Sequence, residues 1–524
     1  MTTESAAGGP AQRIASGYAV EGQALELGTV VIDGTADPSA QIRIPLATVN
    51  RHGLVAGATG TGKTKTLQLI AEQLSAAGVP VLMADVKGDL SGLSRPGEAN
   101  DKTAARAKDT GDNWAATGFP VEFLSLGTEG LGVPIRATVA SFGPVLLSKV
   151  LGLNATQEST LGLIFHWARE NNRALVTLDQ LRNVISHLTS DEGKADLKSL
   201  GGVSSTTAGV ILRSLVNLEG EGGDTFFGEP KLDPHDLLRV DNQNHGTVSL
   251  LEFSGQSLRP VIFSTFLMWL LADLFNELPE VGDIDKPKLV FFFDEAHLLF
   301  TDASKAFLDQ VEQTVKLIRS KGVGVFFCTQ LPTDLPNDVL SQLGARIQHA
   351  LRAFTPDDQK ALSKTVRTYP KTDVYDLESA LTSLGIGEAV VTVLSEKGAP
   401  TPVAWTRMRV PRSLMGAIGA DEIAKAAKDS PLQAKYGQTI AQPSEPQVRQ
   451  PPPPSPQAPA PRGQYDPLPS YPDPYDIPPM PAPAEPKGPA MWEEVLQNPT
   501  VKSGINTAIR EAVKSIFGTG RRRK

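Results

Sequence analysis

Short apolar runs alternate with amphipathic segments along the chain as far as residue 410. Fully apolar runs are typical of strands buried on both faces of a parallel sheet, and Leu289–Phe293 is one of them. Between the runs, apolar positions recur at helical spacing, as at Leu67, Ile70 and Leu74. This alternation predicts an α/β protein with a parallel-dominated sheet, with strands at residues 52–56, 79–84, 119–126, 247–253, 288–293, 324–329, 346–351, 389–394 and 403–408.

The same pattern divides the chain into segments. The first residues are small and polar and contain no apolar run, so we expect them to be disordered. One α/β core is interrupted by a long stretch with a mainly helical pattern. The expected segments are a disordered N-terminus (1–17), a short β element (18–50), the first part of the core (51–134), a mainly helical insertion (135–240), the second part of the core (241–415) and a helical extension (416–440).

Proline marks the tail, since nineteen of the 41 prolines lie between Pro443 and Pro489. Proline cannot continue a helix or a central strand, so residues 441–490 are predicted to be a disordered linker. Residues 491–524 are predicted to form an amphipathic helix with a basic end. Three uses of this helix remain open: docking onto a neighbouring subunit, which we favour, self-association, and lying on an anionic membrane. The proline-rich segment also suits recognition by a protein partner.

Composition and charge narrow the class of protein. The net charge of −8 argues against a globally basic nucleic-acid binder, but it leaves a local basic channel open. A single cysteine, Cys328, cannot form an internal disulfide and points to a reducing compartment. The most apolar run, Val261–Ala272, is shorter than the roughly 20 residues that span a bilayer, so it predicts a buried helix. We therefore expect a cytoplasmic protein without a transmembrane segment.

A glycine-rich turn between a predicted strand and a predicted helix matches G-x-x-x-x-G-K-[ST] at every fixed position. Its backbone N–H groups can surround a phosphate chain, Lys63 can reach the β- and γ-phosphates, and the Thr64 hydroxyl can hold Mg²⁺. The motif therefore predicts binding of ATP and Mg²⁺. The candidate nucleotide-binding residues are Gly57, Ala58, Thr59, Gly60, Thr61, Gly62, Lys63 and Thr64, together with Thr66 and Asp85.

Two acids and an amide follow buried strands. Asp294 and Glu295 end a strand, where a carboxylate faces the phosphate crevice of an open α/β sheet. Asp294 is the expected magnesium-orienting acid, and Glu295 the expected base for the attacking water. Gln330 follows another strand and is a candidate for positioning that water. The alternatives are a helix-capping acidic pair, a polar loop residue at Gln330 and, for Asp85, an acid in a solvated turn.

Four basic residues are candidates for the cation, supplied by a neighbouring subunit, that neutralises charge in the transition state. Arg319, Lys321, Arg346 and Arg352 are placed for such a role, although surface ion pairing fits at least two of them. Among them Arg346 and Arg352 are retained as catalytic candidates beside Lys63, Glu295 and Gln330.

Taken in order, five segments resemble the HerA–FtsK superfamily, and more closely the bacterial HerA-helicase-like ATPases of the YjgR type. The segments are GATGTGKT at 57–64, VLMADVKGDLSGL at 81–93, KLVFFFDEAHLLF at 288–300, GVGVFFCTQLPTDLP at 322–336 and LGARIQHALRAFTPDDQKAL at 343–362. The resemblance implies a RecA-like P-loop core, a hexameric ring with ATP sites between subunits, and duplex DNA in the pore. It also implies that Arg346 or Arg352 acts in trans.

The main hypothesis is a Mg²⁺-dependent ATP hydrolase that works as an oligomeric DNA translocase or helicase-like motor. The alternative is a nucleotide-controlled oligomeric scaffold that hydrolyses ATP without moving nucleic acid, which the acidic net charge favours. A small-molecule kinase is disfavoured, because an acid directly after Asp294 favours water as the nucleophile.

Overall fold

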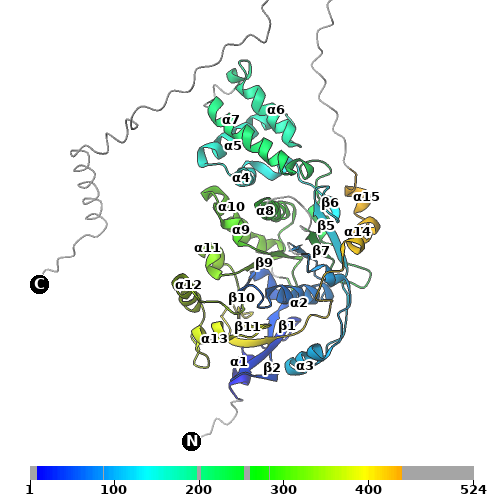
Figure 1. Ribbon diagram of the computed structural model, residues 1–524, viewed down its shortest axis with the longest axis vertical. Helices are drawn as coiled ribbons and strands as arrows, with labels where there is room; N and C mark the ends of the chain where they lie inside the picture. Colours follow the sequence, from blue (N-terminus) through cyan, green and yellow to red (C-terminus); the bar gives the residue numbers. More distant parts are fainter. Residues whose placement is uncertain (1–8, 86–87, 197–201, 253–259, 283, 439–524) are drawn as a thin grey trace, which may run out of the picture. The chain divides into compact units, whose positions relative to one another are not determined.

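The computed structural model describes residues 9–85, 88–196, 202–252, 260–282 and 284–438 (Figure 1). The predicted linker at 441–490 and the predicted terminal helix at 491–524 lie outside these residues. Within the described ranges, no helix has both the length and the apolar character needed to cross a membrane.

One twelve-stranded sheet runs through the described residues in the order β2-β1-β12-β11-β10-β3-β9-β8-β4-β7-β5-β6. Neighbouring strands from β10 to β6 are parallel, which confirms the expected α/β fold with a parallel-dominated sheet. These strands are β10 (Ala345–Gln348), β3 (Gly53–Ala56), β9 (Val323–Thr329), β8 (Leu289–Phe293), β4 (Val81–Asp85), β7 (Val248–Glu252), β5 (Val121–Leu126) and β6 (Val133–Ile135).

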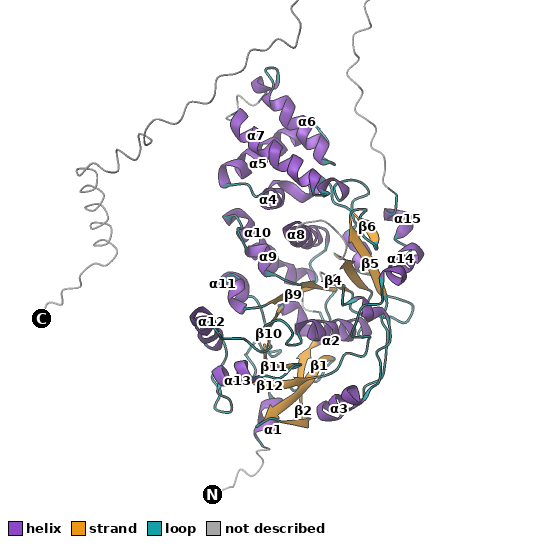
Figure 2. Cartoon of the chain, in the orientation of Figure 1, coloured by secondary structure: helices purple, strands orange, loops and turns teal. Residues whose placement is uncertain are grey.

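Helices cover both faces of this sheet, as the apolar runs predicted (Figure 2). On β8, Phe291 and Phe293 pack into one core with α8 and α10, whereas Val290 and Phe292 pack into a second core with α2. Alternate side chains of a strand point to opposite faces, so a strand covered on both sides is apolar throughout. The helices here are α2 (Lys63–Ala76), α8 (Pro260–Glu277) and α10 (Lys305–Ile318).

Four strands extend the sheet beyond β10 with antiparallel pairing. They are β11 (Glu388–Val393), β12 (Ala404–Met408), β1 (Ala24–Ile32) and β2 (Thr35–Pro45). The predicted N-terminal β element is thus a hairpin that joins the main sheet through β12.

The expectation that residues 1–17 are disordered is wrong for Pro10–Ser16, which form helix α1. The helix buries Ala11 and Ile14, and the following Tyr18 hydroxyl donates a hydrogen bond to Val391 O at 2.8 Å. Two apolar residues in an otherwise polar stretch do not form a pattern that predicts a helix from the sequence. Packing against the antiparallel strands, instead of helix propensity, stabilises this helix.

The described residues of the stretch 135–240 form four α-helices that pack onto the core. Phe142 of α4 stacks on Trp269 of α8, with ring centroids 6.4 Å apart. The apolar side chains of these helices join the same core as α8 and α10, and Figure 1 shows them grouped next to α8. They are α4 (Val139–Leu151), α5 (Ala155–Glu170), α6 (Leu178–Thr189) and α7 (Ser205–Gly220).

The remaining α-helices of the described residues are short, with eleven residues or fewer. They are α3 (Asp101–Thr110), α9 (His297–Phe300), α11 (Asn337–Leu340), α12 (Pro356–Val366), α13 (Leu377–Ser383), α14 (Ala420–Asp429) and α15 (Gln433–Tyr436).

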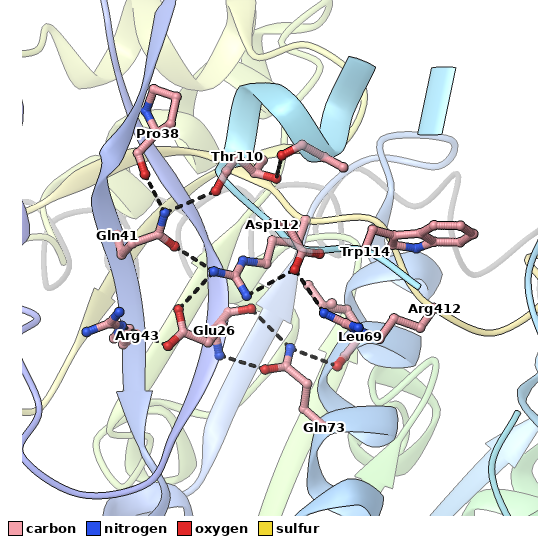
Figure 3. A network of polar contacts seen from close by, with 12 residues as sticks. Glu26, Pro38, Gln41, Arg43, Leu69, Gln73, Thr110, Asp112, Trp114 and Arg412 are labelled. Carbon is pink, nitrogen blue, oxygen red and sulfur yellow. Dashed lines mark hydrogen bonds and ion pairs between the residues drawn. The ribbon is translucent and has the colours of Figure 1, made fainter. Parts of the chain in front are cut away.

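A polar network fixes α2 against the antiparallel strands (Figure 3). Gln73 of α2 exchanges two hydrogen bonds with the backbone of Glu26 in β1, at 2.7 and 3.0 Å. The Arg409 guanidinium donates to Glu26 Oε2 at 3.0 Å and to Gln41 Oε1 at 2.8 Å, and pairs with Asp112 at 3.5 Å. The helix that follows the glycine-rich turn is therefore tied to β1, β2 and the segment after β12.

His52 joins the start of β3 to two neighbouring elements. Its Nδ1 accepts the Val325 N–H of β9 at 3.0 Å, so its Nε2–H donates to Val315 O of α10 at 2.8 Å. The side chain is buried, and burial lowers the pKa of His52 from its ordinary value of 6.5 to about 4. The folded protein thus holds this imidazole neutral.

Replacing His52 with leucine should lower the free energy of unfolding at pH 8 by about 1–3 kcal/mol, because the buried Val325 N–H loses its acceptor. The unfolded chain protonates His52 near pH 6.5 and the folded chain only near pH 4. The contribution of neutral His52 to the free energy of unfolding is therefore fully present above pH 6.5 and is lost as the pH falls toward 4. Thermal unfolding of the wild type and the variant should show a smaller difference in stability between them at pH 5 than at pH 8. An equal difference at both pH values would contradict this role.

Candidate functional site

The glycine-rich turn connects β3 to α2, and the helix begins at Lys63. Gly62 caps the helix with φ 114°, and Gly57 has φ 151°. A Cβ atom built on Gly57 would lie 2.6 Å from the Cβ of His349, so only glycine fits there. The turn presents backbone N–H groups at the positive end of a fourteen-residue helix, which is an arrangement that binds phosphate.

Three segments from other parts of the chain hold this loop. Gly57 N–H donates to Thr329 O at 3.2 Å, at the end of β9. Ala58 N–H donates to Ala350 O at 2.8 Å, just after β10. The Thr61 carbonyl accepts Gly387 N–H at 3.0 Å, from the turn before β11. The loop conformation is therefore imposed by its neighbours as well as by its own glycines.

His349, which the sequence analysis missed, lies beneath the loop. Burial lowers the pKa of His349 to about 4, so the ring is neutral near pH 7. Its Nδ1–H donates to Glu388 O at 2.8 Å, which leaves Nε2 to accept the Thr66 hydroxyl at 3.0 Å. Thr66, predicted to bind nucleotide, is thus turned toward His349 and is buried. A lone histidine after a strand matches no motif, so no sequence signal marked it.

A cavity of about 260 Å³ opens at the loop and brings the main predicted residues together. Lys63 donates from Nζ to Gly57 O at 2.6 Å and to Ala58 O at 3.2 Å, so its ammonium group lies across the loop. The cavity is lined by Thr59, Gly60, Gly62, Lys63, Thr64, Lys65, Asp89, Asp294, Glu295 and Ile386.

Strand order explains why Asp294 and Glu295 reach this cavity. They follow β8, which β9 alone separates from the loop strand β3. All three strands are parallel, so their carboxyl ends meet at one edge of the sheet, with neighbours about 4.8 Å apart. Glu295 N–H donates to Asp294 Oδ1 at 2.9 Å. Glu295 has φ 47°, a left-handed conformation that costs energy for this residue type and is frequent at functional sites.

The lining residues fit a magnesium ion that is shared with a phosphate chain. Among the described residues, no group of three or more His, Cys, Asp or Glu side chains could hold a metal ion by itself. Magnesium usually keeps several waters and takes one or two protein oxygens besides substrate phosphates. The Thr64 hydroxyl and the Asp294 carboxylate, which line the same cavity, match that requirement.

Asp85, predicted to bind nucleotide, ends β4 but does not line the cavity. It is buried, and its carboxylate accepts the N–H groups of Asp89 at 3.2 Å and Leu90 at 2.9 Å. Burial raises the pKa of Asp85 to about 6, although these hydrogen bonds oppose the increase. Asp85 therefore holds the backbone at Asp89 and Leu90, and Asp89 is the nearby acid that lines the cavity.

Gln330, Arg346 and Arg352 do not line the cavity. Gln330 is exposed and follows β9, next to Thr329, whose hydroxyl donates to Asp334 at 2.6 Å. Arg346 lies on β10 and donates to Thr368 O at 3.1 Å. Arg352 donates to Thr59 O of its own loop at 3.2 Å. Of the two candidate arginines, Arg352 is thus the one that touches the loop within the same chain.

Comparisons with known proteins identify the family and the fold of the chain. The family model described as "Helicase HerA-like C-terminal" (HerA_C) matches residues 31–524. The bacterial conjugative coupling protein TrwBdeltaN70 has a TM-score of 0.51 at 15% identity, over 78% of this chain and 94% of its own. TrwB in complex with the ATP analogue ADPNP has a TM-score of 0.50 at 16% identity, over 77% of this chain and 98% of its own. Both structural similarities show the fold alone, which is a RecA-like P-loop fold. No curated protein matches the chain in sequence.

Replacing Gly57 with alanine should weaken binding of Mg·ATP by about tenfold or more, because the new Cβ would collide with His349. Gly34 provides the control, since it also has positive φ (76°), nothing lies within 4 Å of an added Cβ, and it does not line the cavity. Titration with a fluorescent ATP analogue should therefore separate the two alanine variants. Equal affinities would contradict the proposed packing of His349 against the loop.

Proposed function

Because the chain belongs to the family of helicase HerA-like C-terminal domains, we propose that it is a Mg²⁺-dependent ATP hydrolase that works as an oligomeric motor on DNA. The observation that carries this proposal is the convergence of Lys63, Thr64, Asp294 and Glu295 on one cavity at the carboxyl edge of the sheet. A cytoplasmic location is part of the proposal.

The loop and its lysine would bind the phosphate chain. Backbone N–H groups at the start of α2 surround the β-phosphate, and the Lys63 ammonium moves from the loop carbonyls to the β- and γ-phosphate oxygens. Thr64 and Asp294 would hold magnesium, Thr64 directly and Asp294 through water. When bound, the ion supplies positive charge that balances the negative charge developing on the phosphates.

Glu295 would act as the general base. It lies at the end of β8 beside Asp294, where it can accept a proton from the water that attacks the γ-phosphate. The new bond joins the water oxygen to phosphorus as the bond to the β-phosphate oxygen breaks, which yields ADP and phosphate. His297 Nδ1 lies 3.5 Å from Glu295 Oε2 and can help to orient this carboxylate. Gln330, directly after β9, which lies between β3 and β8, would help to position the water.

The two candidate arginines differ in their contacts within one subunit. Arg352 already reaches its own loop, which favours a role in its own subunit. Arg346 then remains the candidate that acts on a neighbour's nucleotide, and this role would require release from Thr368 O. The family resemblance supports a ring, with a hexamer as the proposed form.

The Glu295→Gln variant should still bind Mg·ATP, since glutamine keeps the size of the side chain, but its turnover should fall by about 10²–10⁴-fold because no base accepts the proton. Steady-state phosphate release and an ATP titration measure the two properties separately. Glu98→Gln, at an exposed carboxylate outside the cavity, is the matched control. Unchanged hydrolysis in Glu295→Gln would remove Glu295 from the catalytic role.

Duplex DNA should stimulate ATP hydrolysis by the assembled protein, and the stimulation should fall steeply between about 50 and 200 mM salt, because DNA phosphate contacts release counterions. The measurement is ATPase rate against DNA concentration at each salt concentration. An assembled oligomer that hydrolyses ATP but does not respond to DNA at low salt would contradict the motor. Assembly that depends on nucleotide would then favour a nucleotide-controlled scaffold.

A further inference from the structure

Ile386 is the only large apolar residue among the described residues that line the nucleotide cavity. Its side chain is 76% exposed, which is unusual for isoleucine. The other lining residues are glycines, threonines, lysines and acids, which suit phosphate and magnesium. An aliphatic side chain serves neither of these ligands, so Ile386 requires a different explanation.

The turn that carries Ile386 is held firmly. The Arg106 guanidinium, from α3, donates to Ile386 O at 3.2 Å and to Gly387 O at 3.1 Å. On the other side, Gly385 N–H donates to Glu388 Oε2 at 3.0 Å. These contacts fix the backbone on both sides of Ile386, so the turn presents this side chain in a defined position.

The position of the turn relative to Asp294 and Glu295 determines which end of a bound nucleotide faces Ile386. In the sheet, β9 and β8 lie on one side of the loop strand β3, and β10 and β11 lie on the other. Glu295 follows β8, so the γ-phosphate end of a bound nucleotide belongs on that side. Ile386 precedes β11, and its neighbour Gly387 donates to Thr61 O of the loop from the opposite side. A triphosphate that begins near Glu295 therefore directs its nucleoside toward Ile386.

We propose that Ile386 packs against the face of the nucleobase of the bound nucleoside triphosphate. The inference rests on the proposed ATPase function and adds a statement about substrate range. Four polar groups of the turn are already hydrogen-bonded: Gly385 N–H, Ile386 C=O, and both backbone groups of Gly387. The turn therefore contacts the base through an apolar face, which any purine offers. ATP and GTP should bind with similar affinity.

The test is a set of titrations with ATP, GTP and inorganic tripolyphosphate, each with Mg²⁺, on the full chain. Ile386→Ala should weaken ATP and GTP alike by about five- to twentyfold, because it removes apolar contact with the base. Tripolyphosphate has no base, so its affinity should not change. Val216→Ala is the control, since Val216 is an exposed aliphatic residue on α7 that does not line the cavity.

Three results would overturn the proposal. The first is an unchanged ATP affinity in Ile386→Ala. The contradiction would be strongest if Phe354→Ala weakened ATP binding instead, since Phe354 is an 86% exposed aromatic residue that does not line the cavity. An equal loss for tripolyphosphate would show that the substitution distorts the loop. A change in particle mass with unchanged affinity would make Ile386 a subunit contact. Failure of the wild type to bind ATP and tripolyphosphate would refute the proposed function as well, and this outcome is distinct from the other three.

Discussion

The parallel alignment of β3, β9 and β8 is the constraint on which the site depends. Each strand ends at the same edge of the sheet, so the loop after β3 and the acids after β8 share one cavity although they are more than 200 residues apart in sequence. Burial of both faces of these strands fixes their register, because a shift of one residue would exchange the two cores. The hydrophobic cores that stabilise the fold thus also set the geometry of the proposed chemistry.

The end of the sheet where pairing becomes antiparallel supports the loop from the opposite side. His349 connects Thr66 to the backbone of Glu388, and Gly387 binds the loop carbonyl of Thr61. The neutral state of His349 matters, because a protonated ring could not accept the Thr66 hydroxyl. β11, through its first residue and the turn before it, therefore acts as part of the nucleotide site.

Much of this arrangement could be predicted from the sequence, and the exceptions have physical causes. The loop at Gly57–Thr64 and the pair Asp294 and Glu295 were predictable, because local motifs at strand ends carry their chemistry. His349 and Ile386 were not, because their roles come from pairing between distant strands that no local pattern encodes. Asp85 has the residue type of a ligand, but its carboxylate binds the backbone N–H groups of Asp89 and Leu90 instead. Helix α1 was missed because its stability comes from tertiary contact.

A structure of the protein with ADPNP and Mg²⁺ tests the central claim most directly, namely that this cavity is the site of ATP hydrolysis. We expect the γ-phosphate between Lys63 and Glu295, magnesium about 2.1 Å from the Thr64 hydroxyl, and the base beyond the loop on the side of β11. A nucleotide bound elsewhere, or one whose γ-phosphate lies away from Glu295, would contradict the account.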